Sequence, residues 1–289
     1  MFNKDNLWTM DQIGFMFLPD SKPDTWKIID PTTDTEVGEY YELDATVYTY
    51  ADSTPDDEHE IIGAFQMFRD RPEYSVYRAH KLIHDLNTDN FSTLDDASDL
   101  YDTLIAGCAI MLYGEESGLK RTDSFLKWIR NTDFYQAPAS AKYHDAFEGG
   151  LLKHSLDVVY HITDLLQLES FSTVNIASCV LVALTHDLCK IGLYKPYLKN
   201  VKNEETGQWE KERAYTYNDA NIPLGHGTAS LYIVQKFFHL SLEEALAIRW
   251  HMGRWNMCDG EVGEYHVAVK KYPLVYMLQF ADQLSIKEY

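Results

Sequence analysis

The segment ALTHDLCKIG, Ala183–Gly192, places a histidine and an aspartate side by side where an apolar run ends. The run spans Ala177–Leu184, and the polar pair after it is His186-Asp187. Burying an imidazole and a carboxylate beside aliphatic side chains is costly unless a partner satisfies them, and a metal ion is such a partner. The pair therefore gives the first indication of a metal site.

Four more residues of these two chemical types lie within or beside helix-like apolar patterns. A single histidine of this kind is more often a core residue hydrogen-bonded to the backbone than a metal ligand. A series of six such groups favours a ligand set instead. The four are His154, His226, His251 and Asp282.

His154 illustrates the local pattern. Leu151, Val158, Ile162 and Leu165 recur at helical spacing on its face, so the ring is expected to point into the core with these aliphatic side chains. Imidazole and carboxylate ligands without thiolate suit Mn, Fe, Co, Ni or Zn, with Mg also possible, rather than a closed structural zinc site. We therefore expect one or two divalent ions in a catalytic role.

These residues resemble the ligand pattern of the HD-domain superfamily of metal-dependent phosphohydrolases. The H…HD…D pattern of that family matches His154, His186-Asp187 and Asp282, and Lys190 continues its HDxxK form. The resemblance implies that one ion takes these histidines and aspartates. A second ion would share Asp187, the central catalytic residue, and take two histidines that match the two-metal branch of the family: His226 and His251.

Longer segments narrow the resemblance. Residues 134–159 and 225–253 are similar to HD hydrolases that are frequent in phages and prophages. The first segment, together with residues 278–287, is also similar to the HD domain of a bacterial 3′-to-5′ exoribonuclease. The resemblance covers roughly residues 120–289 and implies a mainly α fold, an HD-type helical bundle.

Lys190 lies four positions after His186, one turn further along if the helix continues. An ammonium there can clamp a phosphate oxygen, as a catalytic or substrate-binding group. The alternative is an exposed lysine near a helix C-terminus, because Gly192 suggests that the helix ends here. Weaker substrate-binding candidates are Arg254, which follows the Gly253 turn, and Lys153 and His144, which flank Gly149-Gly150.

The segment between Lys190 and His226 is polar, aromatic-rich and turn-rich, with Thr206-Gly207 between two strand-like pieces. We expect a hairpin or lid inserted beside the metals. Four of its side chains can stack on a base or grip phosphate; a solvated hairpin without a ligand role is the alternative. The four are Tyr194, Lys195, Trp209 and Tyr215.

A chain of 289 residues exceeds one average domain. We expect an acidic N-terminal region of mixed α and β structure at residues 1–118 and the metal-binding domain at residues 119–289, with the boundary in the segment GEESGLKR. A small sheet is expected near residues 25–50 and a surface loop at STPDDEHE. Expected helices are IIGAFQMFRD, YRAHKLIHDL and SDLYDTLIAGCAIMLYG, the last ending at Gly114. His80 and His84 have the i, i+4 spacing of many metal pairs, but a surface helix explains them better.

Charge is unevenly distributed. Residues 1–120 contain 25 acidic and 8 basic residues, a net charge of −17, whereas residues 121–289 contain 20 acidic and 17 basic residues, a net charge of −3. The acidity argues against a grip on duplex DNA by the N-terminal region, because phosphate binding requires lysine and arginine. Short or single-stranded substrates at the C-terminal site are favoured.

Composition indicates a soluble, cytoplasmic protein. No run of about 18 apolar residues occurs, and the first residues lack a basic-then-apolar leader. The cysteines have no CxxC spacing and are expected to be ordinary thiols, although Cys189 adjoins the HD pair and is a possible site of oxidation. The sequence gives no indication of the oligomeric state.

We expect a metal-dependent phosphohydrolase or phosphodiesterase that acts on a nucleotide or a short single-stranded nucleic acid. Two alternatives stay open. The ligand set also resembles that of HD-type di-iron oxygenases, which use the same histidine and aspartate cage. A non-catalytic module that binds a nucleotide is the third possibility.

Overall fold

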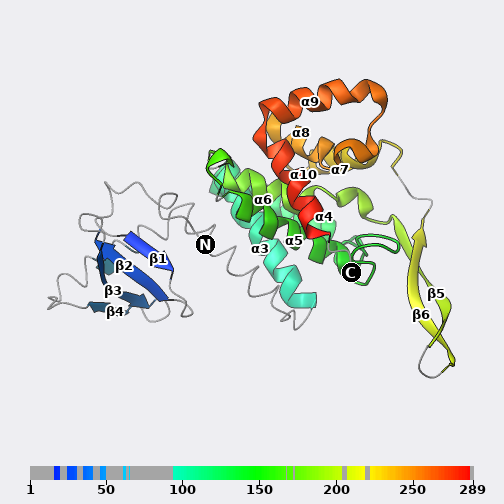
Figure 1. Cartoon of the computed structure of the whole chain (residues 1–289), viewed down its shortest axis with the longest axis horizontal. Helices are drawn as coiled ribbons and strands as arrows, with labels where there is room; N and C mark the ends of the chain where they lie inside the picture. Colours follow the sequence, from blue (N-terminus) through cyan, green and yellow to red (C-terminus); the bar gives the residue numbers. More distant parts are fainter. Residues whose placement is uncertain are drawn as a thin grey trace. The chain divides into compact units, whose positions relative to one another are not determined.

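The computed structural model describes residues 16–19, 25–30, 35–41, 46–49, 61–62, 65, 94–166, 168–171, 173–203, 207–218 and 222–286. The chain divides into two compact units, Met1–Ala79 and His80–Tyr289. The described part is mainly helical, with a small antiparallel sheet in the first unit and a two-stranded hairpin in the second (Figure 1).

The first unit contains a four-stranded antiparallel sheet with its strands in chain order. Its strands are β1 (Met16–Pro19), β2 (Thr25–Asp30), β3 (Thr35–Tyr41) and β4 (Thr46–Thr49). Trp26 and Ile28 of β2 and Tyr40 of β3 pack with Ile61 and Phe65 into a small core of their own. The sheet expected near residues 25–50 is confirmed.

Several expectations for the first 93 residues lie outside the described part of the chain. They are the helix that would carry His80 and His84, the loop STPDDEHE, and most of the helix expected at residues 61–70.

The second unit is a helical bundle. Its α-helices are α3 (Leu94–Tyr113), α4 (Glu115–Ile129), α5 (Gly150–Leu165), α6 (Ile176–Thr185), α7 (His226–Val234), α8 (Leu242–Trp250), α9 (Val262–Lys271) and α10 (Pro273–Ser285). Short 3-10 helices are η3 (Glu169–Phe171), η4 (Leu188–Lys190), η5 (Gly253–Asn256) and η6 (Asp259–Glu261). In the part of the chain that the structure describes, no helix is both long and apolar enough to cross a membrane.

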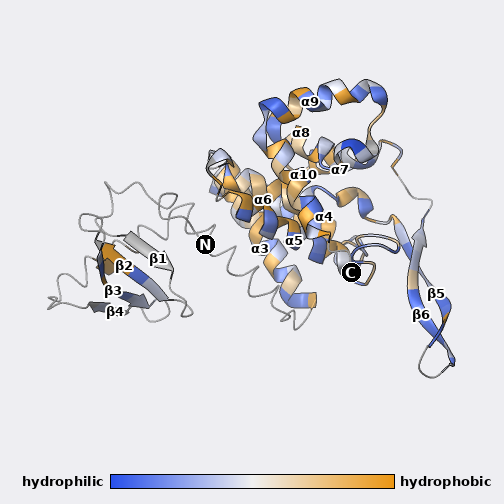
Figure 2. Ribbon diagram, in the orientation of Figure 1, coloured by the Kyte–Doolittle hydropathy of each residue, from blue (hydrophilic) through white to orange (hydrophobic). Residues whose placement is uncertain are grey.

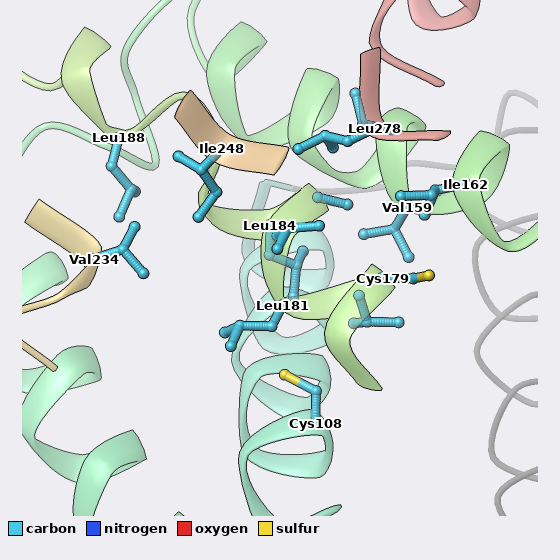
Figure 3. Packing of buried hydrophobic residues seen from close by; sticks show 14 of the residues in the cluster. Cys108, Val159, Ile162, Cys179, Leu181, Leu184, Leu188, Val234, Ile248 and Leu278 are labelled. Atoms are coloured by element: carbon cyan, nitrogen blue, oxygen red, sulfur yellow. The ribbon is translucent and has the colours of Figure 1, made fainter. Parts of the chain in front are cut away.

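Helix α6 lies at the centre of this bundle. It contacts α3, α5, α8 and α10, and every residue of the apolar run Ala177–Leu184 except Ser178 is buried. Figure 3 shows Leu181 and Leu184 among side chains from the surrounding helices. A helix that is apolar on all sides is stable only inside a core, where each aliphatic side chain contributes about 1.5–3 kcal/mol. The sequence therefore forces the end of α6, and the HD pair after it, into the interior.

The segment GEESGLKR is a tight connection between two packed helices. Gly114 has a φ of 78° and ends α3 as expected, and α4 starts at the next residue. A Cβ atom on Gly118 would come within 2.6 Å of the Ile110 backbone, so only glycine allows α3 and α4 to approach this closely.

The helical unit therefore starts before the boundary expected at residues 118 and 119. Helix α3 packs on α4, α5 and α6, and Tyr101 donates a hydrogen bond of 2.9 Å from its hydroxyl to the carbonyl of Leu184. The compact unit begins at His80. The acidic composition of the first 120 residues concealed this, because three of the four acidic residues of α3, Asp95, Asp96 and Asp99, lie on its exposed side.

Helix α3 should carry part of the stability of the helical unit. We expect Ile105→Ala, at a fully buried position, to lower the free energy of unfolding by about 2–5 kcal/mol. Met111→Ala on the exposed side of the same helix is the control and should change it by less than about 1 kcal/mol. Urea unfolding followed by helical circular dichroism measures both, and equal effects would contradict the packing described here.

A hairpin projects from the bundle between η4 and α7 (Figure 1). Strands β5 (Tyr194–Lys202) and β6 (Trp209–Tyr217) pair without interruption, and Gly207 adopts a φ of 71° near the turn. Both strands are mostly exposed and hydrophilic (Figure 2). The hairpin expected in this segment is confirmed.

Candidate metal centre

The structure brings together the six residues singled out as metal ligands. His154 Nε2 lies 3.2 Å from Asp282 Oδ1 and 3.3 Å from both Asp187 Oδ2 and His186 Nε2. These atoms come from α5, α10 and the end of α6, so residues more than 120 positions apart in sequence meet in the core. One half of the expected ligand set is therefore a compact cluster.

The other half of the expected ligand set lies near the second carboxylate oxygen of Asp187, Oδ1. His226 Nε2 is 2.6 Å and His251 Nε2 is 3.5 Å from Asp187 Oδ1. Within the described residues, three groups have ligand atoms that lie within 4.8 Å of one another: His154, His186 and Asp282; His186, Asp187 and His251; and Asp187, Cys189 and His226. The carboxylate of Asp187 thus joins two histidine sets, one on each oxygen.

Two of the histidines are positioned by helix ends. His186 directly follows α6 and donates from Nδ1 to the carbonyl of Ala183 at 2.7 Å, and His251 directly follows α8 and donates to the carbonyl of Ile248 at the same distance. The last carbonyls of a helix have no partner within the helix, so these bonds satisfy them. They also leave Nε2 of each ring without a proton and directed at the cluster.

Ser285 positions His154 in the same manner. The Ser285 hydroxyl donates to the carbonyl of Asp282 at 2.7 Å, so its oxygen accepts from Nδ1 of His154 at 3.1 Å. Nε2 of His154 is consequently the atom that faces the carboxylates. In all three buried histidines, Nδ1 makes the hydrogen bond described, and Nε2 faces the centre of the cluster.

This set of donors fits a divalent cation. Acceptor atoms from imidazoles and carboxylates converge, and the buried Nε2 of His251 has no hydrogen-bond partner among the described residues. Lone pairs that face one another repel unless a cation or a proton lies between them. The residues present are therefore compatible with a metal site that has nitrogen and oxygen ligands.

The charge states of the cluster agree with this assignment. Burial opposes ionisation of Asp187 and Asp282, yet Lys190 and the histidines hold the pKa of Asp187 well below its usual value, and the histidines alone do the same for Asp282. Burial holds the pKa of His186 below its ordinary value, so this ring is neutral. Burial alone would also lower the pKa of His154, but its bonds to the two aspartates raise it to about 9.

Lys190 is buried and lies against the central carboxylate. Its Nζ is 2.6 Å from Asp187 Oδ2, and although burial favours the neutral amine, this contact raises the pKa of Lys190 above its ordinary value. The alternative interpretation of Lys190 as an exposed lysine near a helix C-terminus is therefore wrong. Gly192 does end the segment, with a φ of 69°, but the turn of η4 carries Lys190 inward.

A cavity of about 520 Å³ opens onto the cluster. This volume is within the range of pockets that hold small organic ligands, about 300–1,000 Å³. Its polar lining includes Asp187, Lys190, His226, His251, Asp282 and His144, and its aromatic lining consists of Tyr143, Tyr194, Tyr217 and Trp255.

The remaining substrate-binding candidates occupy different positions. Lys153 forms an ion pair with Asp157, and its Nζ lies 3.6 Å from Asp145. Lys195 and Arg254 are exposed, and neither is among the described residues that line the cavity. Of the expected substrate contacts, His144 and Lys190 line the cavity.

The expected aromatic contacts of the hairpin are also divided. Tyr194 lines the cavity at the base of β5, whereas Tyr215 is buried and Trp209 is 71% exposed at the other end of the ribbon.

Sequence reasoning missed three residues around the ligands. Ser285 orients His154, and Asp145 has an oxygen 3.5 Å from Nδ1 of the cavity-lining His144. Cys189 was considered only for oxidation, but its sulfur lies 3.4 Å from Nδ1 of His226. Burial raises the pKa of Cys189 to about 12, so it is a neutral thiol. Asp145 follows His144 directly, and Ser285 is one turn from Asp282; these spacings are the signals available in the sequence.

The position of Asp145 depends on a glycine. A Cβ atom on Gly150 would lie 2.0 Å from the Asp145 carbonyl, so the loop before α5 reaches the helix only because this side chain is missing. The space left by this glycine is therefore filled by the backbone of the chain itself.

Comparisons of the chain with family models, with curated proteins and with solved structures find no match.

Metal binding should release a proton from His154. With a pKa of about 9, this ring carries a proton at Nε2 at neutral pH that an ion must displace, whereas Asp187 and Asp282 are already ionised. We expect metal affinity to fall by at least about tenfold per pH unit as pH is lowered below about 9. Calorimetry in two buffers of different ionisation enthalpy measures the released proton, and pH-independent affinity without proton release would contradict this.

The bond from His154 to Ser285 should contribute to metal affinity. We expect Ser285→Ala to weaken binding of Mn or Zn by about 10–100-fold, because the ring loses the acceptor that fixes its orientation. Ser155→Ala is the matched control, since this buried serine adjoins His154 but bonds to the Leu151 carbonyl within α5. Competition with a chelator measures both affinities, and an equal loss in the two variants would rule out an orienting role.

Proposed function

We propose that this protein is a metal-dependent phosphohydrolase of the HD type, with one or two ions, that acts on nucleotides or on short single-stranded nucleic acid. The observation that carries the proposal is the convergence of two histidine sets on the two oxygens of the buried Asp187, beside a cavity that Lys190 also lines. The helical bundle and its hairpin are consistent with the fold that the sequence resemblance implies.

Bound divalent ions would activate a water molecule and neutralise charge on a phosphoryl oxygen, which is the chemistry that phosphate ester hydrolysis requires. The chain supplies the rest. Lys190 remains a cation at the cavity wall and can bind a non-bridging phosphate oxygen.

His144 is suited to handle a proton. It lines the cavity, and an oxygen of the Asp145 carboxylate lies 3.5 Å from its Nδ1. Burial opposes ionisation of Asp145, but His144 and Lys153 hold the pKa of this carboxyl below its usual value, so it is ionised. His144 would then donate a proton to the leaving oxygen as the ester bond breaks.

The rim of the cavity favours a substrate that contains a base. Trp255 and Tyr143, which line the cavity, are 87% and 80% exposed, so their ring faces are accessible to a ligand. Aromatic rings stack on bases of any sequence, with about 1–3 kcal/mol per base. Together with Lys190, these rings match the base and the phosphate of a nucleotide.

The two alternatives differ from hydrolysis in what an assay would detect. A di-iron oxygenase would use the same ligands but would take up oxygen and show a mixed-valent iron signal. A binding module would hold a nucleotide without forming product. The cation at the cavity wall and the aromatic rim fit a nucleotide and so favour the phosphohydrolase over the oxygenase, whereas formation of product separates it from the binding module.

Metal analysis of the purified chain, followed by hydrolysis assays on nucleotides and oligonucleotides with Mn, Co, Ni, Zn or Mg, tests the proposal. We expect Asp187→Asn to reduce activity by at least about 100-fold, because the shared carboxylate loses its charge. Asp123→Asn, at an exposed position of α4, is the control with the same chemical change. Full activity of Asp187→Asn, or oxygen uptake by an iron-loaded protein, would overturn the proposal.

A further inference from the structure

The two faces of the hairpin β5–β6 differ in charge. Residues paired across an antiparallel ladder share a side, and alternate residues along a strand share a side. The pairing of Tyr194 with Tyr217 and of Lys202 with Trp209 therefore assigns every side chain to one of two faces. The inner face consists of Tyr194, Pro196, Leu198, Asn200, Lys202, Trp209, Lys211, Arg213, Tyr215 and Tyr217. The outer face consists of Lys195, Tyr197, Lys199, Val201, Glu210, Glu212, Ala214 and Thr216.

The inner face carries no acidic residue. It carries three cations, Lys202, Lys211 and Arg213. On the outer face two lysines are balanced by two glutamates, and Lys199 forms an ion pair of 3.2 Å with Glu212. The chain as a whole has a net charge of −20. A face with charge +3 therefore contrasts with the rest of the protein.

The inner face is continuous with the cavity. Tyr194 and Tyr217 lie at its base, with ring centroids 5.4 Å apart, and both line the cavity beside the metal ligands. Arg213 pairs with Glu148 of the loop before α5, and Tyr215 is buried, so the base of this face is held against the bundle. Farther out, Trp209 is 71% exposed beside Lys202 and Lys211, which form no ion pair with a described residue.

We propose that the inner face of the hairpin binds a single-stranded nucleic acid whose end enters the metal-lined cavity. This inference rests on the proposed function and specifies its substrate as a strand longer than a dinucleotide. Strands of nine residues at about 3.3 Å per residue span roughly 30 Å, enough for several nucleotides. Cations that follow the phosphates and aromatic rings that stack on bases are the features by which proteins bind single strands without sequence preference.

The matched pair of variants changes one face at a time. Trp209→Ala combined with Lys211→Glu alters the inner face, and Tyr197→Ala combined with Lys199→Glu makes the same kinds of change on the outer face. All four residues are exposed, and neither variant replaces a residue that lines the cavity. Circular dichroism verifies that both variants fold.

Binding is measured by fluorescence anisotropy with labelled DNA and RNA strands of about 12 nucleotides, using the chelator-treated full chain so that no strand is cut. We expect the inner-face variant to raise the Kd for a strand at least about tenfold and to reduce the salt dependence of binding by about one counterion. The outer-face variant should bind as the unaltered chain does. Unchanged binding by the inner-face variant, or equal weakening by both, would overturn the inference.

Hydrolysis separates this inference from the proposed function. With metal added, the inner-face variant should lose kcat/KM for the strand but retain the full rate on bis(4-nitrophenyl) phosphate, which is too small to reach from the cavity to Trp209 and Lys211 at the far end of the hairpin. If the unaltered chain hydrolyses neither compound, the proposed function fails, and the anisotropy comparison still shows whether the inner face binds a strand. If the inner-face variant loses activity on both compounds alike, the inference fails.

Discussion

The burial of the Asp187 carboxylate in a helical core is the constraint on which the rest of the structure depends. An ionised carboxylate away from water is unstable unless charge and hydrogen bonds surround it, and one oxygen cannot accept enough of them. The bundle therefore directs four imidazoles and one ammonium at its two oxygens, from four separate segments of the chain. Each of these groups is in turn costly to bury without Asp187.

Helix ends orient the histidine rings of the cluster. His186 and His251 stand one residue past a helix, where the terminal carbonyl needs a donor. The same bond satisfies the backbone and selects the tautomer. Asp282 and Ser285 perform a related task in the last turn of α10, so three helix ends contribute to one cluster.

Much of the site was predictable because its signals are local. Polar ligands within apolar patterns identified all six residues, and the uniformly apolar stretch of α6 indicated burial. The membership of α3 in the bundle was not predictable, because composition describes a whole segment and packing concerns one side of it. The burial of Lys190 depends on the η4 turn, and the roles of Ser285 and Asp145 depend on neighbours that folding brings close. The two faces of the hairpin required the register of its strands, which turn residues alone do not specify.

The register of the hairpin also limits how this protein can change. Adding or removing a matched pair of residues on each strand near Gly207 would alter the reach of the ribbon while every remaining side chain kept its side. An odd insertion in each strand next to the bundle would instead exchange the two faces beyond it and move Glu210 and Glu212 to the inner face. Evolution can therefore adjust the ribbon in steps of two residues per strand without disturbing the bundle, so the reach of the ribbon and the geometry of the ligands can vary independently.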